Sequence, residues 1–261
     1  MPTNVITTDE FLDRWRTPPN FRVGPALIDF DFAWPTALEV LDAVRHDAET
    51  RVALLGDLAP TVRTARTMAF TTAPVTEIIE WPFRLVHFNL SRFYTGVLAG
   101  FQERVMIPWR MFLAAQGFTW HRCAPALFIS GHRSASTFHA DNSHGLVWQL
   151  DGIKTFHSYL DPDQAVPVDD AISGAFTAEH PPPLAQDVHH SVRMQPGDLL
   201  WSHALTPHWV TGETQLSMSV TLTHAGLCHL GCYSAREMAL RKHWDQHPEQ
   251  PWLTDLRNVR Y

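Results

Sequence analysis

Apolar residues follow two different periods along this chain, and the period changes near Ala124. Before that point they recur at the spacing of an amphipathic helix, in the segments 7–15, 35–49 and 103–117. A short strand is expected at 24–32. The first part of the chain is therefore predicted to be mixed, and it carries no evident chemical motif.

The expected helices have signals at their ends. Thr7 or Thr8 is suited to cap the first helix, because a threonine hydroxyl accepts a hydrogen bond from the first turn. Pro35 lies near the start of the second helix, where a missing N–H costs nothing. Gly117 would end the third helix.

After Ala124 the apolar period is two, as in strands with one buried face. Gly, Pro, Asp and Asn separate these short segments. The expected strands are 124–130, 144–150, 153–160, 198–205 and 215–224. Many short strands with such turns favour a barrel or jelly roll, so the fold class is predicted to be mainly β.

The dipeptide Asp-Gly at 151–152 is the strongest hairpin signal in the chain. A two-residue turn there would place Gln149 opposite Lys154 on one face of the hairpin. Trp148 would lie opposite Thr155 on the other face.

We expect a single domain over 1–261. Within it, 1–120 would form a mixed α/β N-terminal region, 121–226 a β-barrel core and 227–261 C-terminal helices. The stretch 161–187 is rich in Pro and Asp and is expected to be a long loop of the kind that often forms a lid.

Composition describes a globular protein, with 45% hydrophobic and 18% charged residues. The net charge is −7 without a basic tract, which argues against nucleic acid as the main partner. No apolar run reaches the length of a membrane span, and no signal peptide is visible. Three cysteines are a sparse, odd set that suits a reducing cytoplasm.

The first candidate for chemistry is His139-x-Asp141. In a strand these two side chains point to one face, and two histidines with one carboxylate form the usual ligand set of non-haem Fe(II) oxygenases. The third ligand would be His203 or His208. The alternative is a plain His–Asp hydrogen bond on a β surface.

The second candidate is Lys154, one of only two lysines against 18 arginines. A lysine inside a barrel is costly unless an anion pairs with it, and an ammonium suits a carboxylate. The alternative is a lysine on the outer face of the barrel. The other lysine, Lys242, lies in a solvated helical context.

The segment 125–162 resembles the core of JmjC-type, cupin-fold dioxygenases that depend on Fe(II) and 2-oxoglutarate. His139 and Asp141 meet the family's H-x-D/E motif, and Lys154 meets its strand lysine, fifteen residues after the first ligand in the asparaginyl hydroxylase branch. Pro-Gly-Asp at 196–198, followed by His208 ten residues after the aspartate, meets a third motif. This register selects His208 over His203.

The resemblance implies a double-stranded β-helix that uses Fe(II), 2-oxoglutarate and O2 to hydroxylate a C–H bond, with succinate and CO2 as co-products. The substrate would be a small molecule, amino acid or peptide, and Asp141 would favour hydroxylation over halogenation. Expected co-substrate contacts are Lys154, Ser136, Thr137, Thr223 and Gln149. Expected substrate contacts are His144, Trp148 and Trp209.

The sequence also departs from the asparaginyl hydroxylases. Gly145 stands where they have an asparagine, and the tyrosine that often shares the co-substrate carboxylate has no evident counterpart in 126–130. Two other functions remain open: a metal-binding cupin that is not a 2-oxoglutarate oxygenase, such as an isomerase, and a non-catalytic regulatory module. Relatives also suggest a homodimer through the C-terminal helices.

Two further histidine groups have alternatives of their own. Cys228, His229 and Cys232, with His224 upstream, could bind zinc or could be buried thiols without a metal. The pair 189–190, His-His, could belong to the rim of a site or could be solvated.

Overall fold

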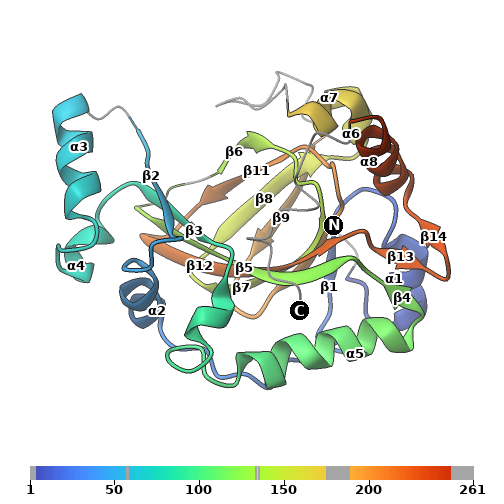
Figure 1. Ribbon diagram of the computed structural model, residues 1–261, viewed down its shortest axis with the longest axis horizontal. Coiled ribbons are helices and arrows are strands. Elements are labelled where there is room, and N and C mark those ends of the chain that lie inside the picture. The colour runs from blue at the N-terminus through green and yellow to red at the C-terminus, as the bar shows by residue number, and fades with distance from the viewer. Residues whose placement is uncertain (1–3, 57–58, 133, 135, 175–188, 248–261) are drawn as a thin grey trace.

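A computed structural model describes residues 4–56, 59–132, 134, 136–174 and 189–247. Its centre is two antiparallel sheets, and helices lie around them (Figure 1). The prediction of a mainly β fold is confirmed. None of the described helices is long and apolar enough to cross a membrane.

The larger sheet has seven strands and contains most of the strands expected from the period of two. In spatial order they are β1 (Phe21–Val23), β10 (Leu199–Ser202), β7 (His144–Asp151), β12 (Leu216–Ala225), β5 (Arg122–Gly131), β3 (Phe83–His87) and β2 (Arg51–Leu54).

The smaller sheet has four strands and faces the larger one. In order they are β6 (Ser136–His139), β11 (His208–Gly212), β8 (Lys154–Tyr159) and β9 (His189–Met194). A third, minor sheet consists of β14 (Cys232–Tyr233), β13 (Cys228–His229) and β4 (Phe118–Thr119).

The eight strands from β5 to β12 pair in a nested order. The first pairs with the last, β5 with β12, and the next pairs are β6 with β11, β7 with β10 and β8 with β9. From β5 to β8 and from β9 to β12 the strands alternate between the two sheets, and β8 and β9 pair as neighbours in the smaller sheet. A pocket lies between the sheets.

Helices cover the outer faces of both sheets. The α-helices are α1 (Thr8–Arg14), α2 (Ala37–Val44), α3 (Pro60–Ala69), α4 (Val75–Ile78), α5 (Ile107–Ala115), α6 (Pro162–Ala165), α7 (Val168–Ser173) and α8 (Ala235–Gln246). A 3-10 turn, Leu90–Phe93, and a π-helical turn, Gln102–Met106, precede α5. All three expected N-terminal helices are confirmed.

Local signals fix two of these helices. The Thr7 hydroxyl accepts from the Glu10 N–H at 3.2 Å, and the Glu10 carboxylate accepts from the Thr7 N–H at 3.1 Å. This capping box makes Thr7, rather than Thr8, the cap. Gly117 follows α5 with φ +83, the left-handed conformation that favours glycine.

The prediction of a strand at 24–32 is wrong. The nearest strand, β1, ends at Val23, just before this stretch.

Two apolar clusters hold the sheets and helices together. The larger lies between the seven-stranded sheet and α1, α2 and α5, with Phe11, Trp15 and Trp109 fully buried in it. The smaller joins the outer face of the four-stranded sheet to α6, α7 and α8 through residues such as Phe138 and Leu240. Both faces of the β core are therefore supported from outside.

The hairpin expected at 151–152 is wrong. The turn is present, with Gly152 at φ +66, but it carries the chain from β7 in one sheet to β8 in the other. Both edges of β7 are already paired, with β10 and β12, so no edge is left for β8. The Gln149 side-chain amide donates to the turn carbonyls of Asp151 and Gly152 at 2.7 and 3.2 Å.

Candidate metal centre and anion pocket

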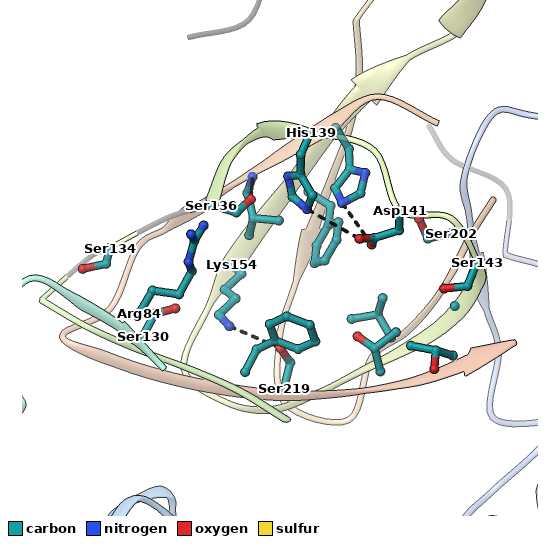
Figure 2. A pocket seen from close by; sticks show the side chains of 18 residues that line it. Arg84, Ser130, Ser134, Ser136, His139, Asp141, Ser143, Lys154, Ser202 and Ser219 are labelled. Atoms are coloured by element: carbon teal, nitrogen blue, oxygen red, sulfur yellow. Dashed lines mark hydrogen bonds and ion pairs between the residues drawn. The ribbon is translucent and has the colours of Figure 1, made fainter. Parts of the chain in front are cut away.

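A pocket opens between the two sheets and contains most of the predicted chemistry (Figure 2). Its walls come from β3, β5, β7, β10 and β12 on one side and from β6, β8 and β11 on the other. Its only acidic wall residue among those described is Asp141, and its cationic ones are Lys154 and Arg84.

His139, Asp141 and His208 meet at this pocket, and one ligand atom from each lies within 4.8 Å of the others. Nε2 of His139 is 3.9 Å from Asp141 Oδ1, and Nε2 of His208 is 3.8 Å from Asp141 Oδ2. The side chain of His208 is 5% exposed and that of Asp141 is 57% exposed. The side chain of His139 is 29% exposed, so the centre is closed at His208 and most open at Asp141.

Strand pairing explains why these residues meet. His139 at the end of β6 lies directly opposite His208 at the start of β11. Asp141 follows just after β6 ends, and its backbone carbonyl accepts from the Leu205 N–H at 2.7 Å. Two neighbouring strand ends thus bring together residues separated by 69 positions in the sequence.

The two imidazole rings are oriented in the same way. Nδ1 of His139 lies 2.7 Å from the Thr137 carbonyl, and Nδ1 of His208 lies 2.9 Å from the Thr206 carbonyl. A carbonyl only accepts, so each Nδ1 donates, and in the neutral ring the lone pair is then on Nε2, facing Asp141. Burial, and then the neighbouring His139, lower the pKa of His208, which favours the neutral ring. This donor set fits a divalent metal ion.

Lys154 is buried in the same pocket, at 4% exposure. Its Nζ donates to Ser219 Oγ at 3.2 Å, and no carboxylate of the described chain forms an ion pair with it. Burial lowers the pKa of Lys154 to about 7. An amine held this way fits an anion, because an opposite charge would restore the ammonium form.

Arg84 is the second cation of the pocket, and the sequence patterns did not predict it as a site residue. It lies on β3, opposite Ser130 of β5, and its guanidinium projects into the cavity on the same side as Lys154 in Figure 2. Within the described part of the chain it has no hydrogen-bond or ion-pair partner. Two cations therefore face one end of a pocket whose other end holds the His/Asp triad.

Comparison with solved structures shows the fold. The Escherichia coli ribosomal oxygenase YcfD matches with a TM-score of 0.56 and 14% identity, over 95% of this chain and 58% of that one. Its complex with cobalt and 2-oxoglutarate matches with a TM-score of 0.53 and 13% identity, over 92% of this chain and 56% of that one. This chain is similar in fold to YcfD. It spans less than three fifths of the length of those structures.

The structure with cobalt and succinic acid gives the same TM-score, 0.53, at 13% identity, over 92% of this chain and 56% of that one. By sequence alone, no protein-family model matches the chain, and no curated protein matches it either. The resemblance of the short motifs to JmjC-type dioxygenases is thus supported by the fold rather than by overall sequence similarity.

The other expected co-substrate contacts divide into two groups. Ser136 and Thr223 line the pocket. Their hydroxyls are already engaged: Ser136 Oγ accepts from the Val210 N–H at 3.0 Å, and Thr223 Oγ1 donates to the Ala124 carbonyl at 2.8 Å. Thr137 and Gln149 do not line it.

Trp148, Trp209 and His144 do not line this pocket, and their contact with a substrate stays a prediction. Strand alternation explains this, since their neighbours Val147, Val210 and Gly145 face the pocket. Trp148 packs on Phe30 and Trp34, Trp209 stacks on His157, and His144 stacks on Trp201.

Three of the remaining histidine candidates contact backbone carbonyls, and Cys228 and Cys232 are free thiols. Nε2 of His203 lies 3.0 Å from the Arg14 carbonyl, and Nε2 of His190 lies 2.6 Å from the Asn20 carbonyl. Nε2 of His229 lies 2.9 Å from the Gln116 carbonyl. Among the described residues, His139, Asp141 and His208 form the one cluster suited to a metal ion, so the zinc site at 228–232 is not formed.

Proposed function

We propose that this protein is an Fe(II)- and 2-oxoglutarate-dependent oxygenase that hydroxylates a C–H bond. The observation that carries the proposal is one pocket with a two-histidine, one-carboxylate cluster at one end and two cations at the other. The fold of YcfD, solved with cobalt and 2-oxoglutarate, supports it. The nested pairing of β5 to β12 also supports it, since we infer that this pairing is a double-stranded β-helix.

In this proposal His139, Asp141 and His208 bind Fe(II). The carbonyls of Thr137 and Thr206 hold the rings so that both Nε2 atoms face the same point as the Asp141 carboxylate. Such partners fix the tautomer and raise the basicity of a ligand histidine. Three protein ligands leave positions open for a chelating co-substrate and for O2.

Lys154 and Arg84 would bind the far carboxylate of 2-oxoglutarate. Lys154 donates from β8 and Arg84 from β3, so the two cations approach from different sheets. Ser219, which already accepts from Lys154, would keep the ammonium directed into the pocket. Burial lowers the pKa of Lys154 to about 7, so a bound anion would favour its ammonium form.

When bound, Fe(II) and 2-oxoglutarate supply the oxidation of a C–H bond by O2, with succinate and CO2 as co-products. The chain's own task is placement and exclusion of water. Phe128, Val147, Phe156 and Val210 line the pocket and give it apolar walls.

We further propose that the substrate, a small molecule, amino acid or peptide, enters beside Asp141. This is the exposed member of the triad, and in Figure 2 Ser143 and Ser202 lie next to it. A homodimer through the C-terminal helices stays a prediction; α8 lies within the described chain, and residues 248–261 lie outside it.

The test is an anaerobic titration of the purified chain with Fe(II) and then 2-oxoglutarate. We expect a visible metal-to-ligand charge-transfer band that appears only when both are present. Under O2, succinate should form slowly even without the true substrate. Asp141→Ala should abolish the band and the succinate, because it removes one of the three ligands.

Each failure would have its own meaning. Metal binding without any spectral response to 2-oxoglutarate would favour a metal-binding cupin of another activity. No metal binding by the wild-type chain would favour a non-catalytic module. Either result would contradict the proposed function.

A further inference from the structure

The loop 203–207, between β10 and β11, touches the triad at two points. The Leu205 N–H donates to the Asp141 carbonyl at 2.7 Å. The next residue, Thr206, offers its carbonyl to Nδ1 of His208 at 2.9 Å. This loop therefore sets the backbone position of one ligand and the ring orientation of another.

The loop has a strained backbone at this place. Leu205 has φ +55, in the left-handed region that a bulky side chain seldom adopts. Such conformations cost free energy and persist only where the surroundings hold them. The Leu205 side chain is fully buried in the cluster under α7 and α8. The surroundings of the loop must hence supply its rigidity.

One contact from α8 holds the loop directly. Nη1 of Arg236, in the first turn of α8, donates to the Leu205 carbonyl. Nη2 of the same guanidinium pairs with Asp163 Oδ1 on α6 at 2.6 Å. Arg236 is 6% exposed, and a charge so buried is tolerated only when it is paired. Both partners are thus part of what keeps Arg236 in place.

A second contact runs in parallel through His144. Its Nδ1 accepts from the Ala204 N–H at 3.4 Å, and its Nε2 lies 3.3 Å from the hydroxyl of Ser234, the N-cap of α8. The start of α8 is therefore connected to two successive residues of the loop. Arg236 carries the shorter and charged connection.

We propose that Arg236 is a positioning residue for the metal centre: by holding Leu205 from α8, it fixes Asp141 and His208 in the geometry that binds the metal. The inference rests on the proposed function. Arg236 itself does not line the pocket, so it would act through the loop alone.

The test is a Co(II) titration of the full chain, followed by visible absorption, with unfolding temperature measured on the metal-free protein. Arg236→Met should raise the Kd for Co(II) by ~10–100-fold, the usual effect of losing an outer partner of a metal site. Arg236→Lys, which keeps a donor for the Leu205 carbonyl, should recover most of the affinity. Arg241→Met, on the same helix, should leave the Kd unchanged.

A lower unfolding temperature of Arg236→Met with an unchanged Kd for Co(II) would overturn the inference and leave Arg236 a purely structural role. If Arg236→Met does not fold, Asp163→Asn decides, since Asp163 is largely exposed. A several-fold higher Kd for Co(II) supports the inference, and an unchanged Kd overturns it. Absence of Co(II) binding by the wild-type chain would instead contradict the proposed function.

Discussion

Two groups of histidines lie close together in this molecule and differ in what their ring nitrogens contact. His139 and His208 face the pocket, and each uses Nδ1 on a backbone carbonyl and leaves Nε2 toward Asp141. His203 has a protein partner at both ring nitrogens, Asn20 Oδ1 and the Arg14 carbonyl. A buried histidine thus becomes a candidate ligand when one nitrogen is left open toward another ligand atom.

His144 and His224 belong to the second group, on the helix side of the seven-stranded sheet. Nε2 of His224 accepts from the Trp109 indole N–H at 2.6 Å. Burial is the largest cause of the lowered pKa of both, and it brings that of His224 to about 3. They are neutral rings used for packing and hydrogen bonding, and the comparison predicts that their loss costs stability rather than metal binding.

The largest effect is expected from removing a pocket histidine. His208→Ala should weaken Co(II) binding by more than the ~100-fold that outer partners of a metal site cost, because it deletes a ligand. Activity should fall with it. Co(II) should raise the unfolding temperature of the wild-type chain and leave that of the variant unchanged. Equal stabilisation of both proteins by Co(II) would remove His208 from the site.

The three residues of the candidate metal centre could largely be predicted from the sequence, because the signals that mark them are local. His139 and Asp141 are two residues apart at a strand end, and His208 lies at a family spacing after the 196–198 turn. Lys154 was predictable for a different reason, because lysine is rare in this chain. A rare residue type within an apolar strand is visible without a structure.

The features that the sequence could not predict depend on pairing between strands that are far apart in the chain. The turn at 151–152 looks like a hairpin, but β10 and β12 occupy both edges of β7, and only the whole sheet shows this. The face of Trp148 depends on the same register. Arg84 is one of 18 arginines, and it lies on a strand about 70 residues before Lys154. No local signal distinguishes it.

The second-largest effect is expected from replacing Lys154, the buried lysine of the pocket. Lys154→Met should raise the Kd for 2-oxoglutarate by ~10–100-fold, since a charged hydrogen bond to a carboxylate is worth roughly 1.5–3 kcal/mol. Lys242→Met, the matched control on α8, should leave that Kd unchanged because Lys242 is exposed. Isothermal titration with Co(II) present measures both. Equal Kd values for Lys154→Met and the wild-type chain would contradict the anion role.

The third effect is a pH dependence of the same Kd. Burial lowers the pKa of free Lys154 to about 7, so the amine is charged below this pH and neutral above it. Anion binding needs the charged form, whose fraction falls from about one half at pH 7 to about one hundredth at pH 9, so the affinity for 2-oxoglutarate should fall by up to about fiftyfold over this range. Lys154→Arg, which stays charged, should flatten the profile. A wild-type affinity that does not change over this range would argue against an ammonium–carboxylate pair.

The smallest effect is expected from replacing His224, which belongs to the second group of histidines. His224→Phe keeps an aromatic ring, though a larger one, and removes the acceptor of the Trp109 N–H; a buried donor without a partner costs ~1–3 kcal/mol. Chemical denaturation should show this loss of unfolding free energy, while the Kd for Co(II) should equal that of the wild-type chain. A weakened Co(II) affinity would mean that the two groups are coupled through the sheet, since His224 is directly opposite His144, which contacts the loop before His208.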